Sequence, residues 1–178
     1  HQVTGQYGVL NVINSGSAME LDEETISLIK EVIKEKKIHT LWFEAHYMYR
    51  KKLASFAEQF APAKVKFRCG VETFDTALRE AWKKGIPSSV SVQDIAQHFQ
   101  GICLLCCTQG ETKEHILKDI ELAKAHFEYF SVNVFCDNHT PIKQDKELAS
   151  WFAKVVYPII KDDPRIEVLM ENTDLGVG

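Results

Sequence analysis

Six short apolar segments recur along the chain, and a segment with helical periodicity separates each one from the next. The strand-like segments are Tyr7–Ile13, Ile38–Glu44, the start of Lys66–Asp75, Gly101–Cys107, Tyr129–Phe135 and Ile166–Met170. They recur at intervals of roughly 28–36 residues, the length of a strand–helix unit, and no hairpin signal lies between them. The sequence therefore predicts an α/β fold with about six parallel strands in one domain, residues 1–178.

The intervening helices have recognisable ends. We expect them over Asp22–Lys37, Arg50–Phe60, Asp75–Lys84, Ser91–Phe99, a stretch opened by Thr112, and Asp145–Ile160. Ser91 and Thr112 are predicted N-caps, because their hydroxyl oxygens can accept the free amides of a first helical turn. Pro158 is expected to kink or end the last helix, because proline lacks a backbone N–H.

Four polar residues interrupt the apolar strands: Asn11, Glu44, Arg68 and Asn133. Burying an unpaired polar or charged group is costly, so these residues point to a polar space that several strands share. Complete small barrels usually fill their interior with Val, Ile and Leu. A doubly wound open sheet also fits the strand order. The polar residues favour an open, partial (β/α) barrel of the TIM-like type with a ligand in its mouth.

The stretch Lys66–Asp75 contains the strongest candidate site residue. Its alternation places Arg68 and Glu72 on one face, and Glu72 lies at the C-terminal end of the strand, where α/β folds place ligand contacts. For Glu72 the alternative is pairing with Arg68 or capping a helix. For Arg68, neutralising a ligand and forming a structural salt bridge are both open. Glu44 and His46 lie at the end of the strand Ile38–Glu44. For these two residues, contact with a ligand and a place in a solvated loop are both open interpretations.

Composition narrows the class of protein. The net charge of −4 and the pI near 6.0 do not favour nucleic acid as a partner, and no apolar run approaches the roughly 18–20 residues that span a bilayer. The five cysteines are odd in number and lie mostly in apolar runs, which is typical of reduced, buried thiols in a cytoplasmic protein.

The stretch Cys136–His139 lacks zinc spacing and is expected to be a loop. The helical His98, His115 and His126 are expected to face solvent.

Three stretches, taken together and in this order, resemble the radical S-adenosylmethionine (radical SAM) superfamily. They are RCGVETFDTALRE from Arg68, GICLLCCTQGETKEHILKDI from Gly101, and FSVNVFCDN from Phe130. The resemblance implies a partial (βα)6 barrel that binds S-adenosylmethionine (SAM) across the C-terminal ends of its strands. It also implies that Glu72 reaches the cofactor's ribose, and that Gly101-Ile102 and Gly110-Glu111-Thr112 begin and close the family's fifth strand.

The turn Asn14-Ser15-Gly16-Ser17 resembles the family's glycine-rich turn, whose backbone holds the amino group of the methionine moiety. The usual Gly-Gly-Glu is not written here. The cofactor-binding residues expected from the resemblance and from the strand faces are Asn14, Ser15, Gly16, Ser17, Glu44, Arg68, Glu72 and Asn133. For Asn133, bonding a ligand's amide or adenine edge and satisfying neighbouring backbone are both open. No catalytic residue is assigned.

The family's signature, C-x3-C-x2-C, is absent from this sequence. In the family its three thiolates hold a [4Fe-4S] cluster. Cys103 and Cys107 have the C-x3-C spacing of the first two ligands, but both lie within one predicted strand. No residue of this sequence is therefore assigned as a metal ligand. The resemblance implies that the first strand here is the family's second and that the cluster loop lies upstream of His1, which would leave the chain as written inactive.

The reaction that the resemblance implies is reductive cleavage of SAM at the cluster to a 5′-deoxyadenosyl radical. That radical would act on an unknown substrate, small or macromolecular, with an electron from a donor such as flavodoxin or ferredoxin. Two other classes also fit the residues. A different barrel lyase or hydrolase would use Glu44, Arg68 and Glu72 at the strand ends. A non-catalytic binding module would be consistent with a barrel that lacks the cluster motif.

Overall fold

The computed structural model of the protein describes residues 7–14 and 16–171. In these residues six strands form one parallel sheet whose order in space is the order in the chain. The strands are β1 (Val9–Val12), β2 (Thr40–Glu44), β3 (Lys64–Glu72), β4 (Gly101–Cys106), β5 (Tyr129–Val134) and β6 (Ile166–Leu169). Since β1 and β6 each pair on one side only, the sheet is an open half-barrel, and the predicted fold class is confirmed.

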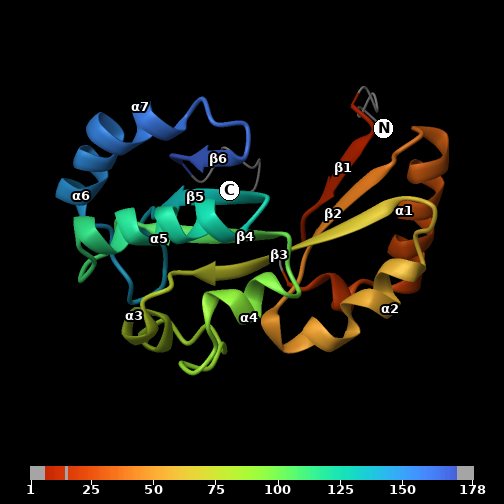
Figure 1. The fold of residues 1–178 in the computed structure, drawn as a ribbon, viewed down its shortest axis with the longest axis horizontal. Helices are drawn as coiled ribbons and strands as arrows, with labels where there is room; N and C mark the ends of the chain where they lie inside the picture. Colours follow the sequence, from red (N-terminus) through yellow and green to blue (C-terminus); the bar gives the residue numbers. More distant parts are fainter. Residues whose placement is uncertain (1–6, 15, 172–178) are drawn as a thin grey trace.

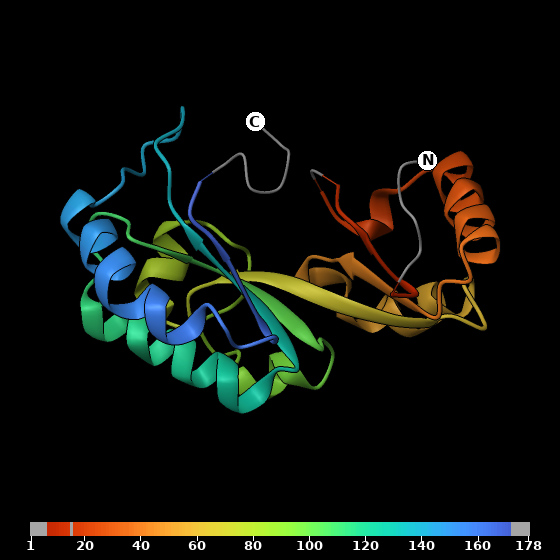
Figure 2. The ribbon, with the colours of Figure 1, turned by 90° about the horizontal axis from the view of Figure 1, so that it is seen from above.

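The sheet is strongly curved, and the helices cover its outer side (Figures 1 and 2). Helix α1 (Glu23–Glu35) lies outside the β1–β2 end, and α5 (Lys113–His126) lies outside the β4–β5 end. The long β3 runs from one half of the molecule to the other. This arrangement leaves the inner side of the sheet facing the opening of the half-barrel.

The two faces of the strands bury different side chains. On the outer face the ring of Phe43 contacts the rings of Phe56, Phe60 and Phe67, with centroids 5.2–6.2 Å apart. The alternate residues of the same strands, including Arg68 and Glu44, point to the inner face. There Arg68 contacts Asn11 of β1, and Glu44 contacts Cys103 of β4. The prediction of a polar interior shared by several strands is therefore confirmed.

The predicted N-caps Ser91 and Thr112 are present, and their hydroxyl oxygens accept the backbone amides of Asp94 and His115. Asp22, expected only as the start of its helix, also caps it by accepting the Thr25 amide. The helices they open are α1, α4 (Val92–Ala96) and α5. The second helical segment, expected over Arg50–Phe60, consists of a 3-10 helix, Tyr47–Lys52, and α2 (Leu53–Glu58). Helix α3 (Thr76–Ala81) is shorter than predicted.

The last helix shows how Pro158 is accommodated. The predicted segment is built from α6 (Lys146–Trp151), a π-helical turn over Phe152–Val156, and α7 (Tyr157–Ile160). Pro158 follows directly after this π-turn, in which the Tyr157 amide donates to the Phe152 carbonyl, five residues back. The expected kink thus takes the form of a π-turn. Among the described residues no helix is long and apolar enough to cross a membrane.

Candidate functional site

Glu72 ends β3 in a strained conformation. A register shift between Gly70 and Glu72 bulges the strand, and Glu72 has a φ of 67°, in the left-handed region that side chains rarely adopt. Its carboxylate Oε1 lies 2.7 Å from Nζ of Lys84, and the Glu72 side chain is 15% exposed. Strained residues of this kind cluster at ligand sites, and here the strain turns an acidic side chain towards the mouth of the half-barrel.

Lys84 is held in place from β2. His46, two residues after β2, places its Nε2 2.9 Å from the carbonyl oxygen of Lys84. Its Nδ1 accepts the Met48 amide at 3.2 Å, so the proton lies on Nε2, which donates to that carbonyl. Gly85 then turns the chain with a φ of 68°, and a Cβ on it would lie 3.1 Å from the His46 ring. His46 is therefore a structural residue that positions Lys84.

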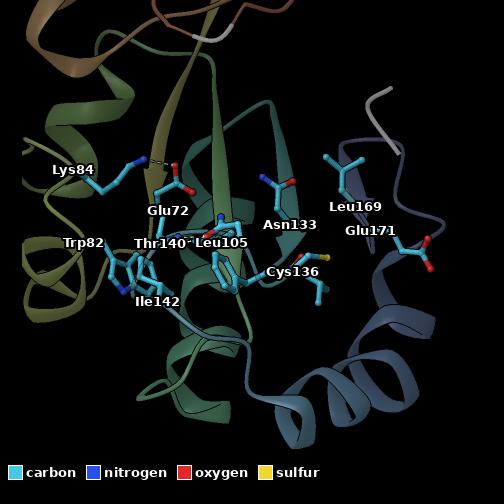
Figure 3. Close-up of a pocket in the computed structure, with 13 residues that line it drawn as sticks. Glu72, Trp82, Lys84, Leu105, Asn133, Cys136, Thr140, Ile142, Leu169 and Glu171 are labelled. Atoms are coloured by element: carbon cyan, nitrogen blue, oxygen red, sulfur yellow. Dashed lines mark hydrogen bonds and ion pairs between the residues drawn. The ribbon is translucent and has the colours of Figure 1, made fainter. Parts of the chain in front are cut away.

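A cavity of about 390 Å³ opens at the C-terminal ends of β3–β6 (Figure 3). Glu72, Lys84 and Trp82 lie on its β3 side, and Leu169 lies on its β6 side. The full lining is Glu72, Trp82, Lys84, Leu105, Asn133, Val134, Phe135, Cys136, Asn138, Thr140, Ile142, Leu169 and Glu171. The cavity combines apolar walls with a few polar groups, which is the usual construction of a small-molecule site.

Asn133 projects from β5 between the two sides of this pocket (Figure 3). Its Oδ1 is buried and has no hydrogen-bond partner within the described part of the chain. Buried amide oxygens are almost always hydrogen-bonded, so an unsatisfied one at a cavity indicates an acceptor for a ligand's N–H or O–H. Of the eight predicted residues, Glu72 and Asn133 are the two that line this pocket.

Arg68 and Glu44 lie below the pocket. The Nη2 of Arg68 donates to Oδ1 of Asn11 at 2.8 Å, and its Nη1 lies 3.8 Å from Glu167, while Nε is buried without a partner in the described residues. Glu44 accepts a contact from Cys103 Sγ at 3.9 Å. Burial raises the pKa of Glu44, and Arg68 partly opposes this. These residues form a polar floor across β1–β6.

The predicted turn after β1 lies at the same edge of the sheet. Asn14 Nδ2 donates to the Ser17 carbonyl at 3.2 Å, and Asn14 Oδ1 is buried without a partner among the described residues. The Ser17 hydroxyl accepts the amides of Met19 and His46, and so caps a 3-10 helix, Ala18–Glu20, and ties the turn to the end of β2. Gly16 lies within this turn, and Ser15 lies outside the described residues.

Several residues that line the pocket were not predicted from the sequence. Trp82 and Lys84 belong to the segment that ends α3, and the Lys84 carbonyl accepts a hydrogen bond from His46 beside the Gly85 turn. The Gly85 turn signal is visible in the sequence, but the contact with His46 is not. Cys136 was expected in a loop, and that loop forms one wall. His115 was expected to face solvent; its side chain is 35% exposed, but its Nδ1 is buried beside the β3–α3 turn.

The cysteines of this chain do not fit an iron–sulfur cluster. All five are free, and Cys69, Cys106 and Cys107 are buried in or beside strands. Burial raises the pKa of Cys103 to about 12, which disfavours the thiolate that a cluster needs. In the described part of the chain no group of three His, Cys, Asp or Glu side chains is arranged to hold a metal ion.

Comparison with known proteins identifies the family. No family model matches the sequence, and no curated protein does. A solved structure does: the queuine lyase from Clostridium spiroforme bound to SAM and queuine is 41% identical, with a TM-score of 0.91. The match covers 99% of this chain and 76% of that one. At this identity and coverage, the chain belongs to the family of that lyase, whose partial barrel is that of the radical SAM enzymes.

Proposed function

We propose that the pocket at the strand ends binds SAM, and that the chain supplies the SAM- and substrate-binding half-barrel of a radical SAM enzyme. The observation that carries the proposal is the joint placement of the Glu72–Lys84 pair and the unsatisfied Asn133 amide in one cavity. The 41% identical lyase, which is bound to SAM and queuine, supports it. The proposed substrate is therefore queuine or a closely related base.

Each predicted residue has a role in this proposal. Glu72 accepts hydrogen bonds from the ribose hydroxyls, and its ion pair with Lys84 holds the carboxylate in place. The backbone of the turn Asn14–Ser17 holds the amino group of the methionine moiety. Asn133 accepts from an N–H of adenine or of the substrate base. Arg68 and Glu44, in the floor, support the strands that carry these groups, and the free Nε of Arg68 is available to a ligand oxygen.

In radical SAM enzymes a [4Fe-4S] cluster supplies the electron that cleaves SAM. The cysteines described here do not fit such a cluster, so this chain's own residues would not hold it. An electron donor such as flavodoxin or ferredoxin belongs to the same proposal. The contribution of this chain is to bind and orient SAM and the substrate next to one another and to exclude water from them.

The proposal is tested by binding. Isothermal titration of the purified protein with SAM, with S-adenosylhomocysteine and with queuine should give saturable binding of at least the nucleoside ligands. Glu72→Ala should weaken SAM binding about tenfold, the value of one lost charge-assisted hydrogen bond. Glu80→Ala, an exposed position on α3, is the matched control. Failure of all three ligands to bind, or equal affinity in Glu72→Ala, would contradict the proposal.

A non-catalytic module is the second candidate, favoured by the absence of a cluster-binding cysteine set among the described residues. The two candidates differ in one product. In a protein supplied with a C-x3-C-x2-C segment upstream of His1, reconstituted with iron and sulfide and reduced anaerobically with dithionite, the enzyme forms 5′-deoxyadenosine from SAM and a binding module does not. Mass spectrometry of the reaction mixture separates them.

A further inference from the structure

A second cavity lies outside the half-barrel, behind the turn that follows β3. Its volume is about 510 Å³, within the range of small-molecule sites. Its walls are the turn before α3, α3 itself, the loop before α4 with the first residues of α4, and α5. No residue lines both this cavity and the pocket at the strand ends. It is therefore separate from the proposed SAM site.

Arg79 of α3 is the unusual member of this cavity. Its side chain is 2% exposed, and its Nη2 donates a hydrogen bond to the carbonyl oxygen of Pro87, at 3.3 Å. Its Nε is buried without a partner in the described residues, and none of the ion pairs found there includes Arg79. Burial lowers the pKa of Arg79, and Asp119 only partly opposes this. A buried guanidinium without an ion pair is costly, and a cavity beside it is where a missing acceptor would bind.

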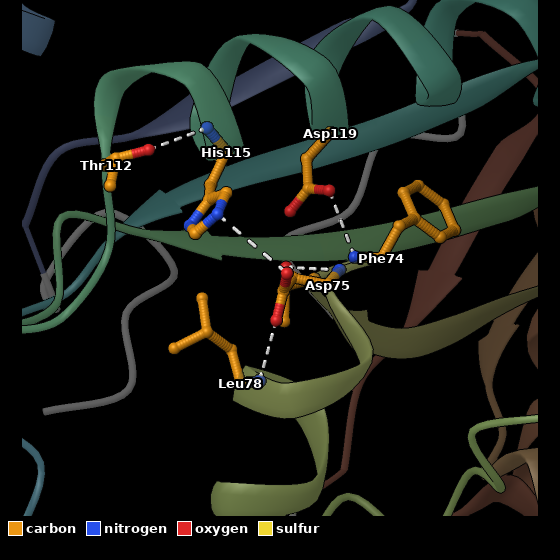
Figure 4. A network of polar contacts seen from close by, with 7 residues as sticks. Phe74, Asp75, Leu78, Thr112, His115 and Asp119 are labelled. Atoms are coloured by element: carbon orange, nitrogen blue, oxygen red, sulfur yellow. Dashed lines mark hydrogen bonds and ion pairs between the residues drawn. The ribbon is translucent and has the colours of Figure 1, made fainter.

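Two further basic side chains, both from α5, line the same cavity. His115 has a buried Nδ1 without a partner within the described part of the chain, and its Nε2 lies 3.9 Å from Oδ2 of Asp75 (Figure 4). Lys118 lies one helical turn further along and is exposed to solvent. Arg79 and these two residues therefore face one space from two elements.

The two acidic side chains of the cavity already bind backbone amides. Asp119 Oδ1 accepts the Phe74 amide at 3.0 Å, and Asp75 Oδ1 accepts the Leu78 amide at 2.9 Å (Figure 4). Neither forms an ion pair with Arg79 or Lys118 among the described residues. They hold the β3–α3 turn, which leaves the donors of Arg79 and Lys118 for a ligand.

We propose that this cavity binds the phosphate group of a small phosphate ester, with Arg79 and Lys118 as the charged donors and Ser88 and Ser89 at the rim. A tetrahedral oxyanion presents several acceptor oxygens, which match the fork of a guanidinium and the point charge of an ammonium. The cavity has room for the alcohol part of the ester as well. Occupancy supplies the acceptor that the buried Arg79 lacks.

The test is phosphate binding by the purified protein without SAM, iron or reductant. Phosphorus-31 NMR titrations at constant ionic strength would use inorganic phosphate in one arm and ribose 5-phosphate in the other, and saturable binding in either arm is expected. Lys118→Gln should weaken that binding about tenfold, and Arg79→Lys, which keeps the charge but loses the fork, by a similar factor.

Lys113→Gln is the matched control, because Lys113 is on the same helix but lies over the Trp151 ring, 5.4 Å from its centroid. Circular dichroism establishes that each variant is folded, and Lys118→Gln alone decides the outcome if the Arg79 variant does not fold. Absence of saturable binding in both arms, or binding equal in Lys118→Gln and Lys113→Gln, overturns the proposal. Since no SAM is present, the result is independent of the proposed function.

Discussion

At the residue scale, the φ of 67° at Glu72 predicts an unusual order of stability, with glycine more stable than alanine at this position. A non-glycine residue in the left-handed region costs about 1–2 kcal/mol, and glycine avoids that cost. Glu72→Ala and Glu72→Gly both lose the contact with Lys84, so their difference isolates the backbone. We expect Glu72→Gly to be more stable than Glu72→Ala by about 1 kcal/mol in urea unfolding.

Lys64, the exposed first residue of β3, provides the control, because its φ is not positive. There the order should reverse, with Lys64→Ala more stable than Lys64→Gly. Should alanine be preferred at both positions, Glu72 would not be strained, and its placement in the pocket would need another explanation.

Glu111 makes the stability of the protein depend on pH. It is 7% exposed, and burial raises its pKa from 4.5 to about 7, although Thr108 donates two hydrogen bonds to its Oε2. Because the folded-state pKa is the higher one, stability is complete below about pH 4.5 and is lost as the pH rises through about 7. The loss amounts to about 3 kcal/mol.

Glu111→Gln cannot ionise, so the difference in unfolding free energy between it and the wild type should change by about that amount between pH 5 and 8. Urea unfolding at the two pH values measures the change. A constant difference across this range would show that Glu111 does not ionise with a raised pKa in the folded protein.

At the scale of elements, Asp119 joins α5 to the β3–α3 turn. Its Oδ1 accepts the Phe74 amide, two residues after Glu72, and the side chain is buried. Asp119→Ala leaves that amide without its acceptor and should cost about 1–3 kcal/mol. Asp119→Asn keeps an acceptor oxygen and should cost little. Hydrogen exchange at Phe74 should be faster in Asp119→Ala alone; equal rates in both variants would mean that the turn is held by other contacts.

The elements themselves were largely predictable from sequence. Short apolar runs separated by helical segments located all six strands, and the caps at Ser91 and Thr112 located two helix starts, because these signals are local. The Lys84 contact with Glu72 was not predictable. It depends on a hydrogen bond from His46, which is 38 residues away along the chain. The cavity around Arg79 has the same origin, since α3 and α5 meet only in the folded protein.

At the scale of the whole molecule, Arg68 closes the floor of the half-barrel. From the central β3 it hydrogen-bonds Asn11 on the edge strand β1 and lies 3.8 Å from Glu167 on the opposite edge strand, β6. Its guanidinium also lies over the rings of Trp42 and Tyr129. The polar pattern of the strands predicted a shared interior, but it could not show that one side chain reaches both edges, because that depends on the curvature of the sheet.

Arg68→Met should therefore open the half-barrel as well as destabilise it. The variant removes a buried hydrogen bond to Asn11 and a charge beside Glu167, which should cost about 3 kcal/mol in urea unfolding. Hydrogen exchange should become faster in both edge strands, and the radius of gyration from X-ray scattering should rise. Lys66→Met, on the same strand as Arg68, is the control: it removes a partly exposed ion pair with Glu128 and should cost less than about 1 kcal/mol. If the two variants behave alike, the curvature of the sheet is set by the outer helices and not by Arg68.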